Sequence, residues 1–249
     1  MSKDETTRQL DKMREEWDRR ARENARHYVA SGKDQWTDDE YFRSGEINVE
    51  REILTDLGNV CQGKKPKQMK VLEIGCGTGR ITRALARYFG QVYAVDISAE
   101  MVRQARLSLR GIPNAHVFQN NGRDLRVIRK AGLPGLLERM GIGRLRFDFA
   151  FSYIVFQHVP SREVIESYVR EVHRLLRPGA LFKFQVQGCA RMDEFDDSWL
   201  GVPFTETDAR EMAERCGFEM RYNHGEGEQY YWLWFFKKPA DPASCDRAL

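Results

Sequence analysis

Short apolar segments alternate with helix-like segments from residue 69 onward, and this alternation restricts the fold more than any other feature. Five apolar segments have the length of strands: "MKVLEI", "QVYAVD", "AHVFQN", "FDFAFSYI" and "LFKFQVQ". Helices are predicted between them over 79–89, over 99–110 with Ser98 as the cap, and from Ser161 to "RPGA", with one short helix in 125–146. Strands that alternate with helices indicate a parallel sheet covered on both faces.

The last two strands are joined too closely to be parallel. A helix predicted over 206–216 is followed by a strand over 218–223, the turn "HGEGE" and the aromatic strand "QYYWLWFFK". About five residues permit a hairpin but not a parallel crossover. We therefore predict an α/β fold with a Rossmann-like doubly wound sheet of seven strands, whose last strand is antiparallel. Ligands bind beyond the carboxyl ends of parallel strands, so the hairpin is expected near the working face, with His224, Glu226, Glu228, Gln229 and Tyr230.

Residues 1–60 have a different pattern, which predicts a helical cap. Apolar residues recur at three- and four-residue steps over 4–30, as on one stripe of an amphipathic helix: Leu10, Met13, Trp17, Ala21, Ala25 and Tyr28. Thr37 and Glu40 have the spacing of a capping box and predict a second helix. We expect "SGE" at 44–46 to interrupt or redirect that helix before a third one over 47–58.

Three parts are predicted along the chain. The helical cap ends near residue 60, and the basic, Gly- and Pro-containing stretch 61–68 has the composition of a linker. A ligand-binding core is expected over 69–238, and a flexible tail over 239–249.

Charge and cysteine content exclude several classes of protein. Lys and Arg number 40 and Asp and Glu 37, mixed along the chain, which argues against a nucleic-acid-binding surface. No apolar run approaches the roughly 20 residues that cross a bilayer, and the charged first residues are unlike a signal peptide. The five cysteines are widely spaced without a C-x-x-C pair, as free thiols in a reducing compartment would be. We expect a cytoplasmic protein with no membrane association and no metal site.

The glycine loop "VLEIGCGTGR", residues 71–80, distinguishes between kinds of nucleotide ligand. A dinucleotide loop reads G-x-G-x-x-G, and the third glycine of that pattern is Arg80 here. The G-K-[ST] ending of a Walker loop is also absent from the sequence. Asp96 closes the second strand, where a carboxylate can accept both hydroxyls of a ribose. The glycine turn lets a ligand approach the backbone closely, and the acid can bind a ribose, but no fixed positive charge is placed for a pyrophosphate. Together these features predict a nucleoside ligand without phosphates.

Four segments resemble the successive motifs of class I S-adenosylmethionine-dependent methyltransferases, in the order and spacing of that family: "VLEIGCGTGR", "VYAVDISAEMVRQAR", "FDFAFSYIVFQHVP" and "EVHRLLRPGALFKF". An antiparallel seventh strand also distinguishes that family. The resemblance covers residues 69–238 and is weaker over the N-terminal helices. It implies a methyltransferase that uses S-adenosyl-L-methionine and releases S-adenosyl-L-homocysteine.

The resemblance also implies cofactor contacts. The residues expected around the methionine and adenosine are Glu73, Gly75, Cys76, Gly77 and Gly79. Asp96 would hold the ribose, and Ile97 and Met101 would flank the adenine. Ser152 and Tyr153 would line the site near the sulfonium. Family members often have an acid after the third strand; this chain has "QNNGRDL", so a side-chain oxygen of Asn120 or Asn121 would meet the adenine amine.

Methyl transfer is an in-line displacement that needs positioning, exclusion of water and sometimes a base. His158, in "FQHVP" after the fourth strand, is the candidate base, with a loop-structuring role as the alternative. His224 in the hairpin is a weaker candidate. The loop 189–204 carries Phe195 and Trp199, which would suit a cover over an apolar substrate.

The function expected is methyl transfer to the O, N or C atom of a small molecule. The cap-like helices and the aromatic loop favour it, and the N-terminal stripe could close the pocket or mediate a homodimer. Methylation of RNA or protein is the alternative, because "KKPK" and nearby arginines are basic, although "FSYIVFQH" lacks the N/D-P-P-[YF] loop of many amino-group methyltransferases. The third hypothesis is a non-catalytic cofactor-binding or scaffold protein.

Overall fold

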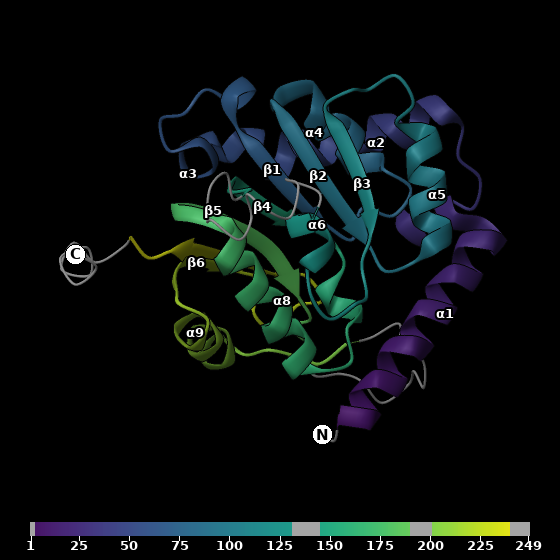
Figure 1. The fold of residues 1–249 in the computed structure, drawn as a ribbon. Helices are drawn as coiled ribbons and strands as arrows, with labels where there is room; N and C mark the ends of the chain where they lie inside the picture. Colours follow the sequence, from purple (N-terminus) through teal and green to yellow (C-terminus); the bar gives the residue numbers. More distant parts are fainter. Residues whose placement is uncertain (1–2, 131–144, 190–200, 240–249) are drawn as a thin grey trace.

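The computed structural model describes residues 3–130, 145–189 and 201–239, which contain one sheet flanked by helices (Figure 1). The strands are β1 (Lys70–Ile74), β2 (Gln91–Asp96), β3 (Ala115–Gln119), β4 (Phe147–Ser152), β5 (Leu176–Val186), β6 (Phe218–His224) and β7 (Tyr231–Lys237). The helices are α1 (Lys3–Val29), α2 (Asp38–Glu52), α3 (Leu57–Cys61), α4 (Arg80–Tyr88), α5 (Ala99–Ser108), α6 (Arg126–Lys130), α8 (Arg162–Leu175) and α9 (Glu206–Arg215). Phe195, Trp199 and the predicted tail beyond residue 239 lie outside the described residues.

The sheet has seven strands in the order β3-β2-β1-β4-β5-β7-β6. β1 to β5 pair in parallel, and β7 runs antiparallel to both of its neighbours. The predicted doubly wound sheet with an antiparallel last strand is therefore confirmed. The chain leaves β1 toward β2 on one side and returns as β4 on the other, and ligands of such sheets bind at this point of reversal.

Alternate strand residues pack on opposite faces of the sheet, so both faces are covered by helices. Leu72 and Ile74 of β1 join the apolar layer that includes α8 and α9, whereas Val71 joins the layer that includes α2, α3 and α4. The same alternation holds in β7, where Trp232 and Phe236 face α2 and α3 while Leu233 faces the opposite layer. This arrangement explains why these strands are apolar on both sides.

The second helix differs from the prediction. It was expected to break at "SGE", but α2 continues from Asp38 to Glu52, and the segment after it forms a short 3₁₀ turn and α3 instead of one helix over 47–58. A Cβ at Gly45 would lie 2.5 Å from the backbone oxygen of Arg80. Gly45 therefore permits the close packing of α2 on α4, which offsets the roughly 1 kcal/mol that a glycine costs inside a helix. The capping box of Thr37 and Glu40 is confirmed.

The fifth strand also begins earlier than predicted. α8 ends at Leu175 and β5 starts at Leu176, so "RPGA" belongs to the strand and not to the helix. The pairing of β4 with β5 shifts register in this stretch, since Phe147 pairs with Leu176 but Phe149 pairs with Leu181. The Pro and Gly of "RPGA" are typical of the end of a helix, so the sequence does not indicate an irregular strand start of this kind. The predicted helix caps Ser98 and Ser161 are both confirmed.

The helix α1 lies beside α5 at one side of the molecule (Figure 1). It bends at Asn24, whose backbone leaves helical geometry while its side-chain oxygen accepts a hydrogen bond from the His27 amide. Leu10 and Met13 reach the main apolar core, and Ala21 and Ala25 pack with Met101 of α5. The predicted apolar stripe thus lies against the sheet domain.

Candidate active site

The glycine turn after β1 brings the backbone close to neighbouring segments. Gly75 and Gly77 both have positive φ, at 74° and 51°. A Cβ at Gly75 would lie 2.1 Å from a methyl carbon of Val155, and one at Gly77 would lie 2.8 Å from a methyl carbon of Val29 on α1. Only glycine fits both the backbone conformation and the space. The amides of Gly75 and Cys76 donate to the carbonyl oxygen of Val95, which ties the turn to β2.

Asp96 at the end of β2 is fixed by the same turn. Its Oδ2 accepts a hydrogen bond from the Gly77 amide at 2.8 Å, and its Oδ1 accepts one from the Ser98 amide at 2.9 Å. Burial raises the pKa of this carboxyl to about 6, although both backbone hydrogen bonds act in the opposite direction. Each carboxylate oxygen can accept a further hydrogen bond, so Asp96 can hold a polar ligand without losing its backbone contacts.

Glu73 is the second acid of the site, and it is buried near the carboxyl end of β1. Its Oε2 accepts a hydrogen bond from Thr82 Oγ1 at 2.6 Å. Burial raises the pKa of Glu73 to about 7, while the Thr82 hydrogen bond and the charge of Arg80 lower it. The thiol of nearby Cys76 is buried too, which raises its pKa well above the usual range and keeps it neutral.

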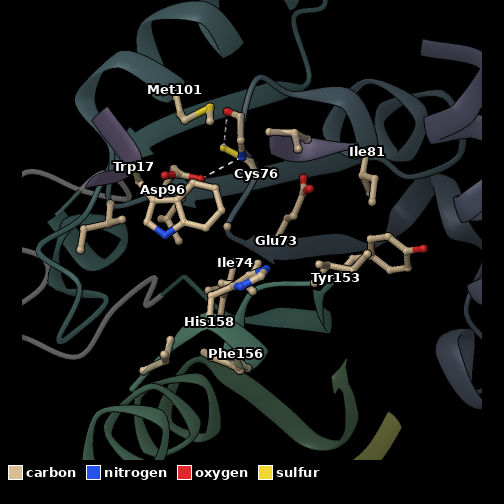
Figure 2. Close-up of a pocket in the computed structure, with 18 of the residues that line it drawn as sticks. Trp17, Glu73, Ile74, Cys76, Ile81, Asp96, Met101, Tyr153, Phe156 and His158 are labelled. Atoms are coloured by element: carbon tan, nitrogen blue, oxygen red, sulfur yellow. Dashed lines mark hydrogen bonds between the residues drawn. The ribbon is translucent and has the colours of Figure 1, made fainter. Parts of the chain in front are cut away.

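These residues line one pocket at the carboxyl ends of β1, β2 and β4. In Figure 2 the side chains of Trp17, Glu73, Asp96 and His158 lie around a common space. Ten of the predicted site residues line this pocket: Glu73, Gly75, Cys76, Gly77, Asp96, Ile97, Met101, Asn120, Tyr153 and His158. The sequence patterns that predicted them lie in four separate segments, and the fold brings all four together.

Three residues predicted to contact a cofactor are not among those that line the pocket. Gly79 caps the start of α4 and lies against Leu109. The absence of a side chain at this position therefore permits close packing beside Leu109. Ser152 is buried and donates to the carbonyl oxygen of Ile74. Asn121 is exposed, and its Oδ1 accepts from the backbone amides of two residues that follow it.

Asn120, and not its neighbour Asn121, offers a side-chain oxygen to the pocket. It is buried, its Nδ2 donates to the hydroxyl of Tyr168 at 2.6 Å, and its Oδ1 has no hydrogen-bond partner among the described residues. A buried carbonyl oxygen without a partner costs about 1–3 kcal/mol. Because Asn120 lines the pocket, a ligand N–H there would satisfy it.

The rest of the pocket wall comes partly from α1, whose apolar stripe was one of the covers that the sequence suggested. This helix contributes Met13, Trp17, Tyr28 and Val29. The further lining residues are Ile74, Arg80, Ile81, Val95, Ile154, Val155, Phe156, Val159 and Tyr168. Several of them lie directly before His158 or inside the glycine motif, so their position in the motifs was the available signal.

His158 lies at the end of a 3₁₀ turn after β4, and its imidazole is buried. The ring meets Trp17 edge to face with centroids 5.5 Å apart, so a residue of α1 holds it in place. It lines the pocket, which leaves both predicted roles open to it: a base near the reaction centre and a structural residue of the loop. His224, the weaker candidate, is at the exposed end of β6 and does not line the pocket.

A second hollow adjoins the first at Tyr28, Val29, Arg80, Tyr153, Ile154 and His158, which line both. Gln229 and Tyr230 of the β6–β7 hairpin reach it, as the predicted antiparallel topology required. Its other lining residues are Ala30, Ser31, Gly32, Trp36, Ser44, Asn48 and Gln157. A ligand in the first pocket and one in the second would therefore meet near Tyr153 and His158.

The described residues contain neither a candidate metal cluster nor a helix able to span a membrane. No group of three or more His, Cys, Asp or Glu side chains there could hold a metal ion. Within the same residues, no helix combines the length and apolar character needed to cross a membrane.

Comparison with known proteins shows that these motifs are similar to those of methyltransferases. Residues 72–182 match the family model described as a methyltransferase domain. The chain is 26% identical over 133 residues to a malonyl-[acyl-carrier protein] O-methyltransferase of Enterobacter lignolyticus, an alignment that covers 53% of this chain and 45% of that protein. It is 32% identical over 111 residues to a ubiquinone biosynthesis O-methyltransferase of Xanthomonas oryzae pv. oryzae, with coverage of 44% and 39%. The matched part thus spans less than half the length of either relative.

The fold is shared with solved methyltransferases. Magnesium protoporphyrin IX methyltransferase of Synechocystis PCC 6803, solved with bound S-adenosylmethionine, superposes with a TM-score of 0.61 over 92% of this chain and 97% of the other, at 16% identity. The seven-stranded sheet with its reversed last strand, the glycine turn joined to Asp96, and the match over residues 72–182 agree with one another. Residues 72–182 are thus similar to methyltransferase domains, and the chain has the fold of the class I S-adenosylmethionine-dependent methyltransferases.

Proposed function

We propose that this protein binds S-adenosyl-L-methionine in the first pocket and transfers its methyl group to a small molecule. The observation that carries the proposal is the hydrogen bond between Asp96 and the Gly77 amide. It places a ribose-binding carboxylate directly beside a turn that admits close approach of a ligand.

The proposed roles follow from position around the pocket. Asp96 accepts the ribose hydroxyls, Ile97 and Met101 flank the adenine, and the orphan Oδ1 of Asn120 accepts from the adenine amine. The turn residues Gly75, Cys76 and Gly77 approach the methionine part. Glu73 supplies negative charge close to a cationic sulfonium when its carboxyl is ionised.

The cofactor supplies the methyl group, and the chain's residues position the two reactants. Trp17 and Val29 of α1 cover the glycine turn and exclude water, so α1 acts as the cap expected from its sequence. The acceptor occupies the second hollow, which meets the first at Tyr153 and His158. His158 can take the acceptor's proton if that acceptor must lose one.

A small acceptor suits the second hollow, which lies between α1, α2 and the β6–β7 hairpin. A relative named for ubiquinone biosynthesis supports an acceptor of this kind. S-adenosyl-L-homocysteine is then the product.

Calorimetric titration with S-adenosyl-L-homocysteine tests the proposal. Asp96→Ala removes a charged acceptor, and since hydrogen bonds to charged groups contribute about 1.5–3 kcal/mol each, we expect at least ~10-fold weaker binding. Glu219→Gln, an exposed acid on β6, is the matched control and should bind as the wild type does. Wild-type protein that fails to bind, or equal binding by Asp96→Ala, would overturn the proposal.

A further inference from the structure

Arg80 is a buried cation whose hydrogen-bond partners carry no charge. It is the first residue of α4 and only 4% exposed. Its Nη1 donates to Ser44 Oγ at 3.1 Å and to Asn48 Oδ1 at 2.6 Å. Across the described parts of the chain, Arg80 forms no ion pair with an Asp or Glu side chain. A buried charge without a counter-charge is costly, so arginines in such places are ordinarily paired.

One edge of the guanidinium is left without an acceptor. Nη1 makes both of the hydrogen bonds described above, and Nε is buried with no partner among the described residues. Nε and Nη2 form the edge of the planar guanidinium that binds a carboxylate through two parallel hydrogen bonds. This edge matches two oxygen atoms of one anion and leaves the contacts to α2 in place.

The two neutral partners of Arg80 belong to the second hollow. Ser44 and Asn48 line it, and neither is among the residues that line the first. They hold Nη1 at the second hollow, and the edge formed by Nε and Nη2 lies opposite Nη1 on the planar guanidinium. The two acids of the site, Glu73 and Asp96, line the first pocket instead.

The charge of the second hollow is complementary to an anion. Of the described residues that line it, Arg80 alone carries a fixed charge, and no Asp or Glu is among them. The remaining wall is aromatic, aliphatic or polar, with rings from Tyr28, Trp36, Tyr153 and Tyr230. An apolar body with one carboxylate would find both a surface to contact and a charge to pair with.

We propose that the methyl acceptor carries a carboxylate that binds the free edge of Arg80 in the second hollow. This inference rests on the proposed function, since it names the class of acceptor for the same site. The competing anion is the carboxylate of the cofactor's own methionine part, because Arg80 also borders the first pocket. The experiment must separate the two.

Benzoate and benzamide are the probes, since they share a ring and differ in charge. Each is titrated into wild-type protein saturated with S-adenosyl-L-homocysteine, and binding is followed by ligand-observed NMR. We expect benzoate to bind at least ~10-fold more tightly than benzamide, as one buried charged pair would give. Equal binding of the two would overturn the proposal, and this comparison needs no variant.

Arg80→Met and Arg80→Lys identify the residue responsible. At saturating S-adenosyl-L-homocysteine, Arg80→Met should abolish the preference for benzoate, and Arg80→Lys should retain part of it. Loss of S-adenosyl-L-homocysteine binding in Arg80→Met, with unchanged binding of 5′-methylthioadenosine, would assign Arg80 to the cofactor and overturn the proposal. Wild-type protein that binds no S-adenosyl-L-homocysteine would refute the proposed function, and the benzoate comparison would still test the anion subsite alone.

Discussion

Glu73→Gln is expected to stabilise the protein without cofactor, and by an amount that depends on pH. Burial raises the pKa of Glu73 from 4.5 to about 7. The native protein therefore holds this proton at pH values where the unfolded chain has released it. Since the unfolded state then binds fewer protons, the free energy of unfolding falls as the pH rises from about 4.5 to about 7.

The size of the effect follows from the shift. At ~1.4 kcal/mol per pH unit, the ionised carboxyl destabilises the native protein by about 3 kcal/mol above pH 7. Glutamine is neutral at every pH and its side-chain oxygen can still accept the hydrogen bond from Thr82. We expect Glu73→Gln to exceed wild type by up to ~3 kcal/mol near pH 8, and by ~1 kcal/mol or less near pH 5.

Urea unfolding of both proteins over this pH range measures the difference. The exposed Glu219→Gln serves as the control and should change stability little at any pH. A pH-independent difference between Glu73→Gln and wild type, or a destabilisation that grows with pH, would refute the reasoning that burial sets this pKa.

Three further changes test the walls of the site. Asn120→Ala removes one acceptor inside the pocket and should weaken S-adenosyl-L-homocysteine binding about 5- to 10-fold in calorimetry. The exposed Asn121→Ala should bind like wild type, and equal effects of the two changes would contradict the assignment of Asn120 to the adenine amine. Trp17→Phe should lose most of the fluorescence change on ligand binding, while Trp234→Phe, whose indole donates to Asp56, should keep it; the reverse result would place α1 away from the ligand. Gly75→Ala should lower the free energy of unfolding by about 1–3 kcal/mol in urea titration because its Cβ would overlap Val155, and wild-type stability would show that the turn is less tight than described.

The sheet could be predicted because its signals are local. Strand length, the helices between strands and the short β6–β7 connection each depend on a few neighbouring residues, and together they determined the topology. Asp96 and the glycine turn could be placed because each ends or follows a strand. The same reasoning brought Gln229 and Tyr230 to the working edge.

The errors arose where a residue serves a distant segment. Gly45 reads as a helix breaker, but it accommodates the backbone of Arg80, 35 residues later, which no local pattern reveals. Asn120 could not be separated from Asn121, because only the fold shows which oxygen is buried without a partner. In the sequence, Arg80 stands out only as a departure from the dinucleotide pattern. Only the contact between α2 and α4 shows that its hydrogen-bond partners among the described residues, Ser44 and Asn48, are uncharged.

Transfer of a labelled methyl group tests the central claim most directly. The protein is incubated with S-adenosyl-L-methionine labelled in its methyl group and an extract of its native cells, and small molecules are then separated from macromolecules. We predict label in the small-molecule fraction with wild-type protein and its loss with Asp96→Ala. Label in RNA or protein, or label that persists undiminished with Asp96→Ala, would contradict the account.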